Sequence, residues 1–185
     1  MTPVAPSTKP LTHRVADLRS AVRDVPDFPK PGIVFKDITP LLANGRLFRD
    51  ACDLMAAPFA DSGIELVAAV ESRGFLLGGP IAQALGVGIV PIRKVGKLPY
   101  TTHRVTYALE YGTDALEVHI DACRDRGRIL VVDDVLATGG TAAAACELIE
   151  AVGGEVAGCS FLVSLSFLDG ARRLAGRRSE SVLVY

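Results

Sequence analysis

The chain has few cysteines, and their spacing suits neither disulfides nor metal binding. Its four cysteines lie far apart along 185 residues, with no Cys-x-x-Cys motif and no Cys/His set of the kind that binds zinc. We therefore predict reduced thiols that act as small apolar side chains, as is typical of a cytosolic protein.

Net charge and targeting signals are missing as well. Lys and Arg total 20 against 21 Asp and Glu, for a formal charge of -1, which gives no electrostatic case for nucleic acid as the main partner. Residues 1–10 are rich in Pro, Ser and Thr and lack the apolar core of a signal peptide. We predict a mobile tail over these residues and a cytoplasmic location.

One uncharged run, residues 75–92, has nearly the length of a membrane span. Several glycines and prolines interrupt it, together with Gln83. These residues predict a helix followed by a strand in a buried core, and no contact with a membrane.

Two common nucleotide-binding motifs are absent. No Gly-Lys-Ser or Gly-Lys-Thr follows a glycine loop, so the phosphate-binding loop of ordinary nucleotide kinases is missing. Three spaced glycines after a strand, the dinucleotide-binding pattern, are missing too.

The residues that are present predict an α/β fold. About half of them (49%) are hydrophobic, and a chain of this length is expected to form one domain that buries about 70% of its unfolded surface. Strands that alternate with helices predict a mostly parallel central sheet flanked by helices. Three prolines at positions 26, 29 and 31 predict an irregular loop. The predicted strands are 66–70, 87–93, the run from 128, 156–165 and 182–185, the helices are 11–25, 45–60, 74–85, 142–149 and 169–175, and the hairpin strands are 105–109 and 115–120.

The most informative segment is residues 128–141, where an apolar strand ends in Asp133 and Asp134. The strand shows no polar alternation, which is typical of burial on both faces. The Thr-Gly-Gly-Thr turn at 138–141 then leaves backbone N–H groups free at the start of a helix, where anions bind. Two acids beside an anion site suit a ligand with hydroxyls next to a phosphate, such as a ribose 5-phosphate.

Two further strand ends lead into polar, glycine-containing turns. Residues 71–74 and 93–99 follow their strands as residues 133–141 follow theirs. In a parallel sheet all three turns lie on the same rim, where ligands collect. Together they offer anion donors, cations and hydroxyl acceptors.

At this point the sequence resembles a known family. Residues 131–141 resemble the phosphoribosyl-pyrophosphate signature of type I phosphoribosyltransferases. Residues 27–40 resemble the N-terminal hood of the adenine-specific branch of this family. Residues 93–99 and 108–112 also resemble segments of that branch, and all the segments occur in the same order. The resemblance implies a type I fold with a small hood and a flexible β-hairpin loop. It implies a single domain over 1–185, with helix and hood at about 11–42 and the α/β core at about 43–185.

The resemblance also implies the reaction and its partners. Adenine and phosphoribosyl pyrophosphate would give AMP and pyrophosphate in purine salvage, with Mg²⁺ as cofactor. The ion would be held mainly by phosphoribosyl pyrophosphate, so no residue is assigned as a metal ligand. The resemblance further implies a homodimer.

Four residues would be catalytic by this resemblance. Asp133 and Asp134 would accept hydrogen bonds from the ribose hydroxyls and add negative potential near C1′. Glu110 would handle the proton on the purine, and Tyr111 would help to close a mobile loop over the site.

The remaining roles implied by the resemblance concern substrate binding. Main chain at Val34 and Arg73 would read the adenine edge, and Phe35 and Val135 would sandwich the ring. The pyrophosphate would lie among Arg73, Arg93, Lys94 and Lys97, and the 5′-phosphate among Ala137, Thr138, Gly139, Gly140 and Thr141.

Two alternatives remain open from the sequence. Some regulators use this fold to sense purines without turnover, although these would be expected to add a nucleic-acid-binding module or a basic face. A phosphoribosyltransferase for a 6-oxopurine is the other alternative. The hood argues against it, because a 6-oxo group accepts a hydrogen bond where the adenine amino group donates one.

Overall fold

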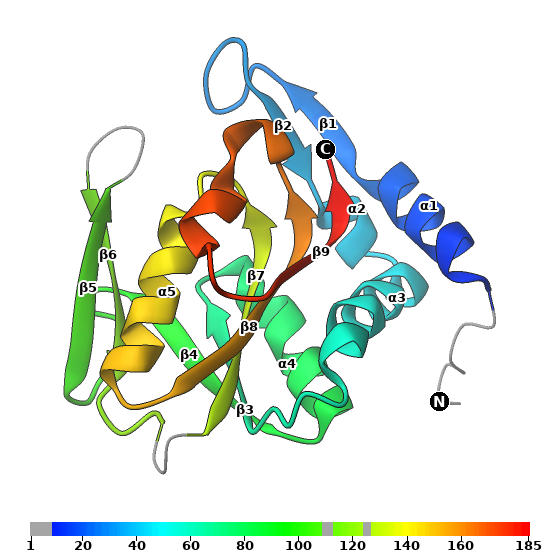
Figure 1. Ribbon diagram of the computed structural model, residues 1–185. Coiled ribbons are helices and arrows are strands. Elements are labelled where there is room, and N and C mark those ends of the chain that lie inside the picture. Colours follow the sequence, from blue (N-terminus) through cyan, green and yellow to red (C-terminus); the bar gives the residue numbers. More distant parts are fainter. Residues whose placement is uncertain (1–8, 109–112, 124–126) are drawn as a thin grey trace. The chain divides into compact units, whose positions relative to one another are not determined.

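The computed structural model describes residues 9–108, 113–123 and 127–185 (Figure 1). The chain divides into two compact units, Met1–Leu54 and Met55–Tyr185. Each unit contains its own β-sheet, of two strands in the first and seven in the second.

The N-terminal unit combines short helices with a two-stranded antiparallel sheet. Asn44 begins its last helix, because the Asn44 Oδ1 atom accepts the N–H groups of Arg46 and Leu47 at 3.1 and 3.2 Å. The last helix, α3, continues into the second unit. In chain order the elements are α1 (Leu11–Ala21), β1 (Arg23–Pro26), β2 (Val34–Asp37), α2 (Thr39–Leu42) and α3 (Gly45–Ala56).

The proline-rich segment differs from the sequence prediction. The first helix ends at Ala21, because the chain before Pro26 turns extended and forms β1. Pro26 is the last residue of β1 and lies opposite Val34 of β2. Only residues 27–33, which join the two strands, are irregular as predicted.

The second unit is built on the predicted parallel sheet, which confirms the α/β fold class. Its strand order is β5-β6-β4-β3-β7-β8-β9, with β5 and β6 as an antiparallel hairpin at one edge. The neighbouring pair of β6 and β4 is antiparallel as well, whereas the pairs from β4 through β3, β7 and β8 to β9 are parallel. The strands are β3 (Leu66–Val70), β4 (Gly88–Lys94), β5 (Thr102–Ala108), β6 (Thr113–His119), β7 (Arg128–Leu136), β8 (Glu155–Ser164) and β9 (Ser179–Val184).

Helices cover both faces of this sheet. The chain runs from β3 through α4 (Arg73–Leu85) to β4, and from β7 through α5 (Gly140–Ala151) to β8. These two right-handed crossovers run in opposite directions from the middle of the sheet, so α4 and α5 lie on opposite faces (Figure 1). Short 3₁₀ turns complete the unit at Ala57–Phe59, Ser166–Leu168 and Gly170–Leu174.

The central strands are buried on both faces, as their uninterrupted apolar runs predicted. Every residue of Ile129–Val132 and of Val67–Val70 is fully buried. Gly78 lets α4 approach this layer, since a Cβ there would lie 2.6 Å from the Ala69 Cβ. The tight packing fixes where the polar ends of β3 and β7 emerge.

The scarce residues behave as predicted. All four cysteines are free and buried.

The uncharged run at 75–92 forms most of α4 and the start of β4. Within the described ranges, helices are all too short or too polar to span a bilayer.

Candidate active site

The direction of the crossovers reverses between β3 and β7, which makes the carboxyl ends of these strands the topological switch point of the sheet. In open α/β sheets this switch point is where ligands bind. Arg73 follows β3, Asp134 lies near the end of β7, and their side chains form an ion pair. The pair joins residues 61 positions apart in the sequence.

The two adjacent acids lie in different environments. The Asp133 Oδ1 atom accepts the N–H of Asp134 at 2.8 Å. Burial and the neighbouring charge of Asp134 raise the pKa of Asp133 well above its ordinary value. Asp134 is only 5% exposed and pairs with Arg73. Asp133 therefore tends to stay protonated, whereas Asp134 is paired with a guanidinium.

The glycine turn after β7 has the geometry of an anion site. Gly139 adopts φ +79° immediately before α5, and the Gly139 carbonyl accepts the Ala143 N–H at 2.9 Å. The first N–H groups of α5 have no acceptor within the helix, and the helix dipole adds positive potential there. A Cβ at Gly139 would lie 2.3 Å from the Gly170 carbonyl oxygen, and one at Gly170 would lie 2.1 Å from that of Ala137. The turn therefore requires glycine on both sides of this contact.

Glu71 joins the turn after β3 to the end of β4. Its carboxylate accepts the Arg93 guanidinium at 3.2 and 3.3 Å and the Lys94 N–H at 3.0 Å. Although burial opposes ionisation, these donors lower the pKa of Glu71 below its ordinary value. Arg93 also lies over the Phe75 ring of α4, with its guanidinium carbon 5.9 Å from the ring centroid. With its further hydrogen bond to the Lys97 carbonyl at 3.1 Å, the Arg93 guanidinium is therefore held by three partners.

Lys94 belongs to a second network, which reaches the first turn of α5. Its ammonium pairs with Asp114 and donates to the Tyr107 hydroxyl at 3.3 Å. Burial opposes the charge of Lys94, but Asp114 and Tyr107 raise its pKa above the ordinary value. The Thr141 hydroxyl lies 3.4 Å from the Tyr107 hydroxyl. Side chains of β4, β5, β6 and α5 therefore meet at one point.

The structure brings most of the predicted core residues to one rim. Asp134 meets Arg73 directly, Arg93 binds the Lys97 carbonyl at 3.1 Å, and Thr141 connects with Lys94 through Tyr107. Val34 and Phe35 belong to β2 of the N-terminal unit, where the Phe35 ring packs edge-on against Phe28. Glu110 and Tyr111 lie outside the described residues, so their predicted roles remain predictions.

Four polar residues of this rim received no role from the sequence: Glu71, Tyr107, Asp114 and Glu117. Each binds a predicted site residue or the turn that carries it. Glu71 could have been found, because it directly follows a buried strand. The other three lie on hairpin strands, whose period-2 pattern does not show what their side chains meet across the sheet.

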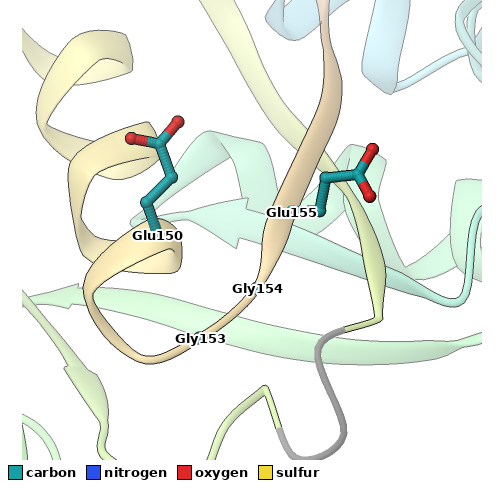
Figure 2. A pocket seen from close by; sticks show the side chains of 4 residues that line it. All are labelled: Glu150, Gly153, Gly154 and Glu155. Carbon is teal, nitrogen blue, oxygen red and sulfur yellow. The ribbon is translucent and has the colours of Figure 1, made fainter.

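A hollow of about 340 Å³ lies where α5 turns into the amino-terminal end of β8, at the opposite end of the parallel strands from the rim described above (Figure 2). Glu150, Gly153, Gly154 and Glu155 line it. Both carboxylates already have arginine partners, Arg177 for Glu150 and Arg128 for Glu155. The hollow also lies at the carboxyl end of α5, which is the negative end of the helix dipole, so it is unsuited to a phosphorylated ligand.

Comparison with known proteins gives a consistent result. The model of the phosphoribosyl transferase domain family matches residues 38–181. Adenine phosphoribosyltransferase of Myxococcus xanthus is 55% identical over 185 residues and covers all of both chains.

Solved structures agree with the sequence comparison. The crystal structure of adenine phosphoribosyltransferase from Rhodothermus marinus is similar with a TM-score of 0.89 and 50% identity, covering 94% of this chain and 99% of that one. The Saccharomyces cerevisiae enzyme, in complex with an imino-altritol bisphosphate and adenine, is similar with a TM-score of 0.87 and 37% identity. That match covers 93% of this chain and 99% of the yeast chain.

Proposed function

The chain belongs to the adenine phosphoribosyltransferase family, and on that premise we propose that it transfers the phosphoribosyl group of phosphoribosyl pyrophosphate to N9 of adenine. The products are AMP and pyrophosphate, as in purine salvage. The observation that supports this proposal most strongly is the set of polar groups at the switch point of the sheet. There, the adjacent acids, the glycine turn and the cations at the ends of β3 and β4 share one rim.

The ribose 5-phosphate would lie over the end of β7. Asp133 and Asp134 would accept hydrogen bonds from the 2′- and 3′-hydroxyls. The N–H groups and hydroxyls of residues 137–141 would hold the 5′-phosphate at the start of α5. This placement directs C1′ toward the turn after β3, where Arg73 pairs with Asp134.

Cleavage of the bond between C1′ and the pyrophosphate oxygen builds positive charge on the ribose and negative charge on the leaving group. The Asp134 carboxylate, and Asp133 in its ionised form, would stabilise the first charge. Arg73, Arg93, Lys94 and Lys97 would hold the departing pyrophosphate. Because these groups are placed before the substrate arrives, little reorganisation is needed in the transition state.

Mg²⁺ fits the donors at this rim, because it prefers carboxylate and phosphate oxygens. When bound, it would neutralise charge on the pyrophosphate. The described ranges contain no group of three or more His, Cys, Asp or Glu side chains arranged to hold a metal, so the ion would depend mainly on substrate oxygens. We expect EDTA to abolish turnover and to weaken phosphoribosyl pyrophosphate binding in calorimetry. Excess Mg²⁺ should restore both.

Adenine would be recognised by the hood. Main chain at Val34 and Arg73 would bind its edge, while Phe35 and Val135 would contact its two faces. These assignments rest on the family resemblance. Phe35→Ala is expected to raise KM for adenine about tenfold, as the loss of a stacking side chain worth about 1–3 kcal/mol would do. KM for phosphoribosyl pyrophosphate should change little.

Glu110 and Tyr111 are proposed to act from the loop between β5 and β6. Glu110 would accept the proton that adenine loses from its imidazole ring as N9 attacks C1′. Glu110→Gln should therefore lower kcat on the order of 100-fold with little change in either KM. An unchanged kcat would remove the proton-transfer role and leave only loop closure.

We also propose that the protein is a cytoplasmic homodimer. Light scattering after gel filtration should give twice the chain mass of 19.5 kDa. Fractionation of cells should place the activity in the cytoplasm.

A base panel tests the proposed function most directly. Adenine, guanine, hypoxanthine and xanthine are each supplied with phosphoribosyl pyrophosphate and Mg²⁺, and nucleotide and pyrophosphate are measured. Only adenine should be converted efficiently. Comparable turnover of guanine or hypoxanthine would replace the adenine assignment with a 6-oxopurine one, and ligand binding without turnover would favour a purine-sensing regulator.

A further inference from the structure

Glu117 is a buried carboxylate that the reaction described above does not use. It lies on β6 between the fully buried Leu116 and Val118 and is itself only 2% exposed. Removing an ionised carboxylate from water costs several kcal/mol unless it is well hydrogen-bonded. Its partners should therefore reveal why a charge is kept there.

Those partners belong mainly to the turn between β4 and β5. The Glu117 Oε1 atom accepts three consecutive backbone N–H groups, from Gly96, Lys97 and Leu98, at 2.9, 3.1 and 3.2 Å. The Oε2 atom accepts the Thr102 hydroxyl at 3.3 Å. One side chain thus fixes the backbone of the turn that carries Lys97.

The ionisation of Glu117 agrees with this geometry. Burial raises its pKa, but the N–H groups of Leu98 and Lys97, the Thr102 hydroxyl and the Gly96 N–H outweigh burial. The pKa therefore lies below its ordinary value. Glu117 is a carboxylate at neutral pH, and its hydrogen bonds to the turn are charge-assisted.

Cross-strand neighbours show that a simpler arrangement was available. Arg93 of β4 and Arg104 of β5 lie directly opposite Glu117, on the same face of the sheet. A glutamate at this position could have formed a plain cross-strand ion pair with Arg93. Arg93 instead binds Glu71 and the Lys97 carbonyl, and Arg104 approaches the Glu117 Oε2 atom only to 3.8 Å.

The turn held by Glu117 is connected to the rest of the rim. Arg93 donates to the Lys97 carbonyl at 3.1 Å and to Glu71 at 3.2 and 3.3 Å. Glu71 lies two residues before Arg73, whose side chain pairs with Asp134. Hydrogen bonds therefore connect Glu117 with Glu71, and the short segment 71–73 continues the connection to the ion pair of Arg73 and Asp134.

We propose that Glu117 is a positioning residue for the pyrophosphate end of the site. This inference rests on the proposed function and adds a residue to it. Glu117 holds the 96–98 turn in one conformation, and the turn in turn places the cations of Arg93 and Lys97. The ordering cost of these long side chains is thereby met before pyrophosphate binds.

Two variants test the proposal. Glu117→Met keeps the length of the side chain and removes both acceptors, so the three N–H groups of the turn lose their partner. Glu117→Gln keeps one oxygen acceptor and removes the charge, which about halves the strength of a hydrogen bond. Glu155→Gln is the matched control, because Glu155 is an exposed carboxylate that pairs with Arg128 at the other end of the parallel strands.

Steady-state kinetics in both directions give the readout. KM for phosphoribosyl pyrophosphate and for pyrophosphate should rise about tenfold in Glu117→Met and about threefold in Glu117→Gln, which correspond to losses of about 1.4 and about 0.65 kcal/mol of preorganisation. KM for adenine and for AMP should stay within about twofold, because neither ligand reaches this turn. The Glu155→Gln control should match the wild type throughout.

The outcomes are distinct. Equal rises in KM for AMP and for pyrophosphate would mean general damage to the fold and would overturn the proposal, as would wild-type KM for pyrophosphate in both variants. If Glu117→Met does not fold, Glu117→Gln decides alone, and an unchanged KM for pyrophosphate there overturns it. Failure of the proposed function itself would show separately, as a wild-type protein that makes no AMP.

Discussion

The two ends of the candidate site are built in different ways. The end proposed to bind the ribose phosphate is one continuous segment, in which β7 runs through two acids and a glycine turn into α5. The end proposed to bind pyrophosphate is assembled from the turns after β3 and β4 and from side chains of the β5–β6 hairpin. Local backbone geometry is sufficient for the first end, whereas the second depends on contacts between distant residues.

This difference predicts how each end fails. A substitution in the continuous segment removes a group that contacts substrate or distorts the backbone that presents it. In the assembled end, a substitution removes one support among several, so the expected losses are smaller and more selective. The following variants test this contrast, starting from the largest expected effect.

Asp134→Ala should cause the largest loss of activity. It removes an acceptor for the ribose hydroxyls and leaves Arg73 without the carboxylate it pairs with in the structure. We expect kcat/KM for phosphoribosyl pyrophosphate to fall on the order of 100-fold, as for a charged hydrogen bond worth about 1.5–3 kcal/mol. Steady-state kinetics measure this, with the exposed Asp61→Ala as control. A loss below fivefold would contradict the assigned role.

Gly139→Ala should damage stability and phosphate binding together. The new methyl group would meet the Gly170 carbonyl at 2.3 Å, in a backbone with φ +79°. We expect about 3 kcal/mol of destabilisation from strain and crowding combined, seen as a lower Tm, together with a raised KM for phosphoribosyl pyrophosphate.

Gly176→Ala separates these two causes. Gly176 has φ +85° but nothing within 4 Å of an added Cβ, so it should cost only about 1 kcal/mol. Equal losses of Tm in the two variants would mean that the contact with Gly170 contributes nothing.

Tyr107→Phe should have a modest effect, because it removes only the hydroxyl that connects Lys94, Asp114 and Thr141. One hydrogen bond of about 1 kcal/mol corresponds to about a fivefold rise in KM for phosphoribosyl pyrophosphate. A double-mutant cycle with Thr141→Val measures whether the two ends are coupled. Strict additivity of the two variants would show that they are independent.

Asp133→Asn should leave the fold intact and raise its stability at neutral pH. Below pH 3.8, the ordinary value, Asp133 is protonated in the folded and the unfolded chain alike. Above it the unfolded chain loses the proton while the folded chain keeps it, so the wild type loses stability as pH rises toward the folded-state pKa. Asparagine does not ionise, so the variant lacks this pH-dependent loss of stability. Thermal melts should show a higher Tm than wild type at pH 7 and no difference at pH 3, and a lower Tm at pH 7 would refute the shift.

Much of the fold was predictable because periodicity and turn residues are local signals. The strand at 66–70 and the helix at 74–85 were predicted to within one residue of β3 and α4. The helix at 11–25 was overextended, because its apolar spacing continued into residues that pair with β2 instead. In that segment tertiary pairing outweighed local periodicity.

The residues of the candidate site show the same difference between local signals and long-range contacts. The sequence of acids and glycine turn at 133–141 was predictable as one polar unit at the end of β7, since adjacent residues share one backbone and their relation does not depend on the rest of the fold. The roles of Asp114 and Glu117 could not be read, because a carboxylate on an alternating strand gives no indication of which loop it will meet.

The sequence by itself determined the parallel sheet, the glycine turn before α5 and the family of the chain, because each is encoded in contiguous patterns of apolar, acidic and glycine residues. Only the tertiary structure decided which cation each carboxylate holds: Arg73 for Asp134, Arg93 for Glu71 and Lys94 for Asp114. These pairings follow from strand order and register, which bring residues up to 61 positions apart within hydrogen-bonding distance.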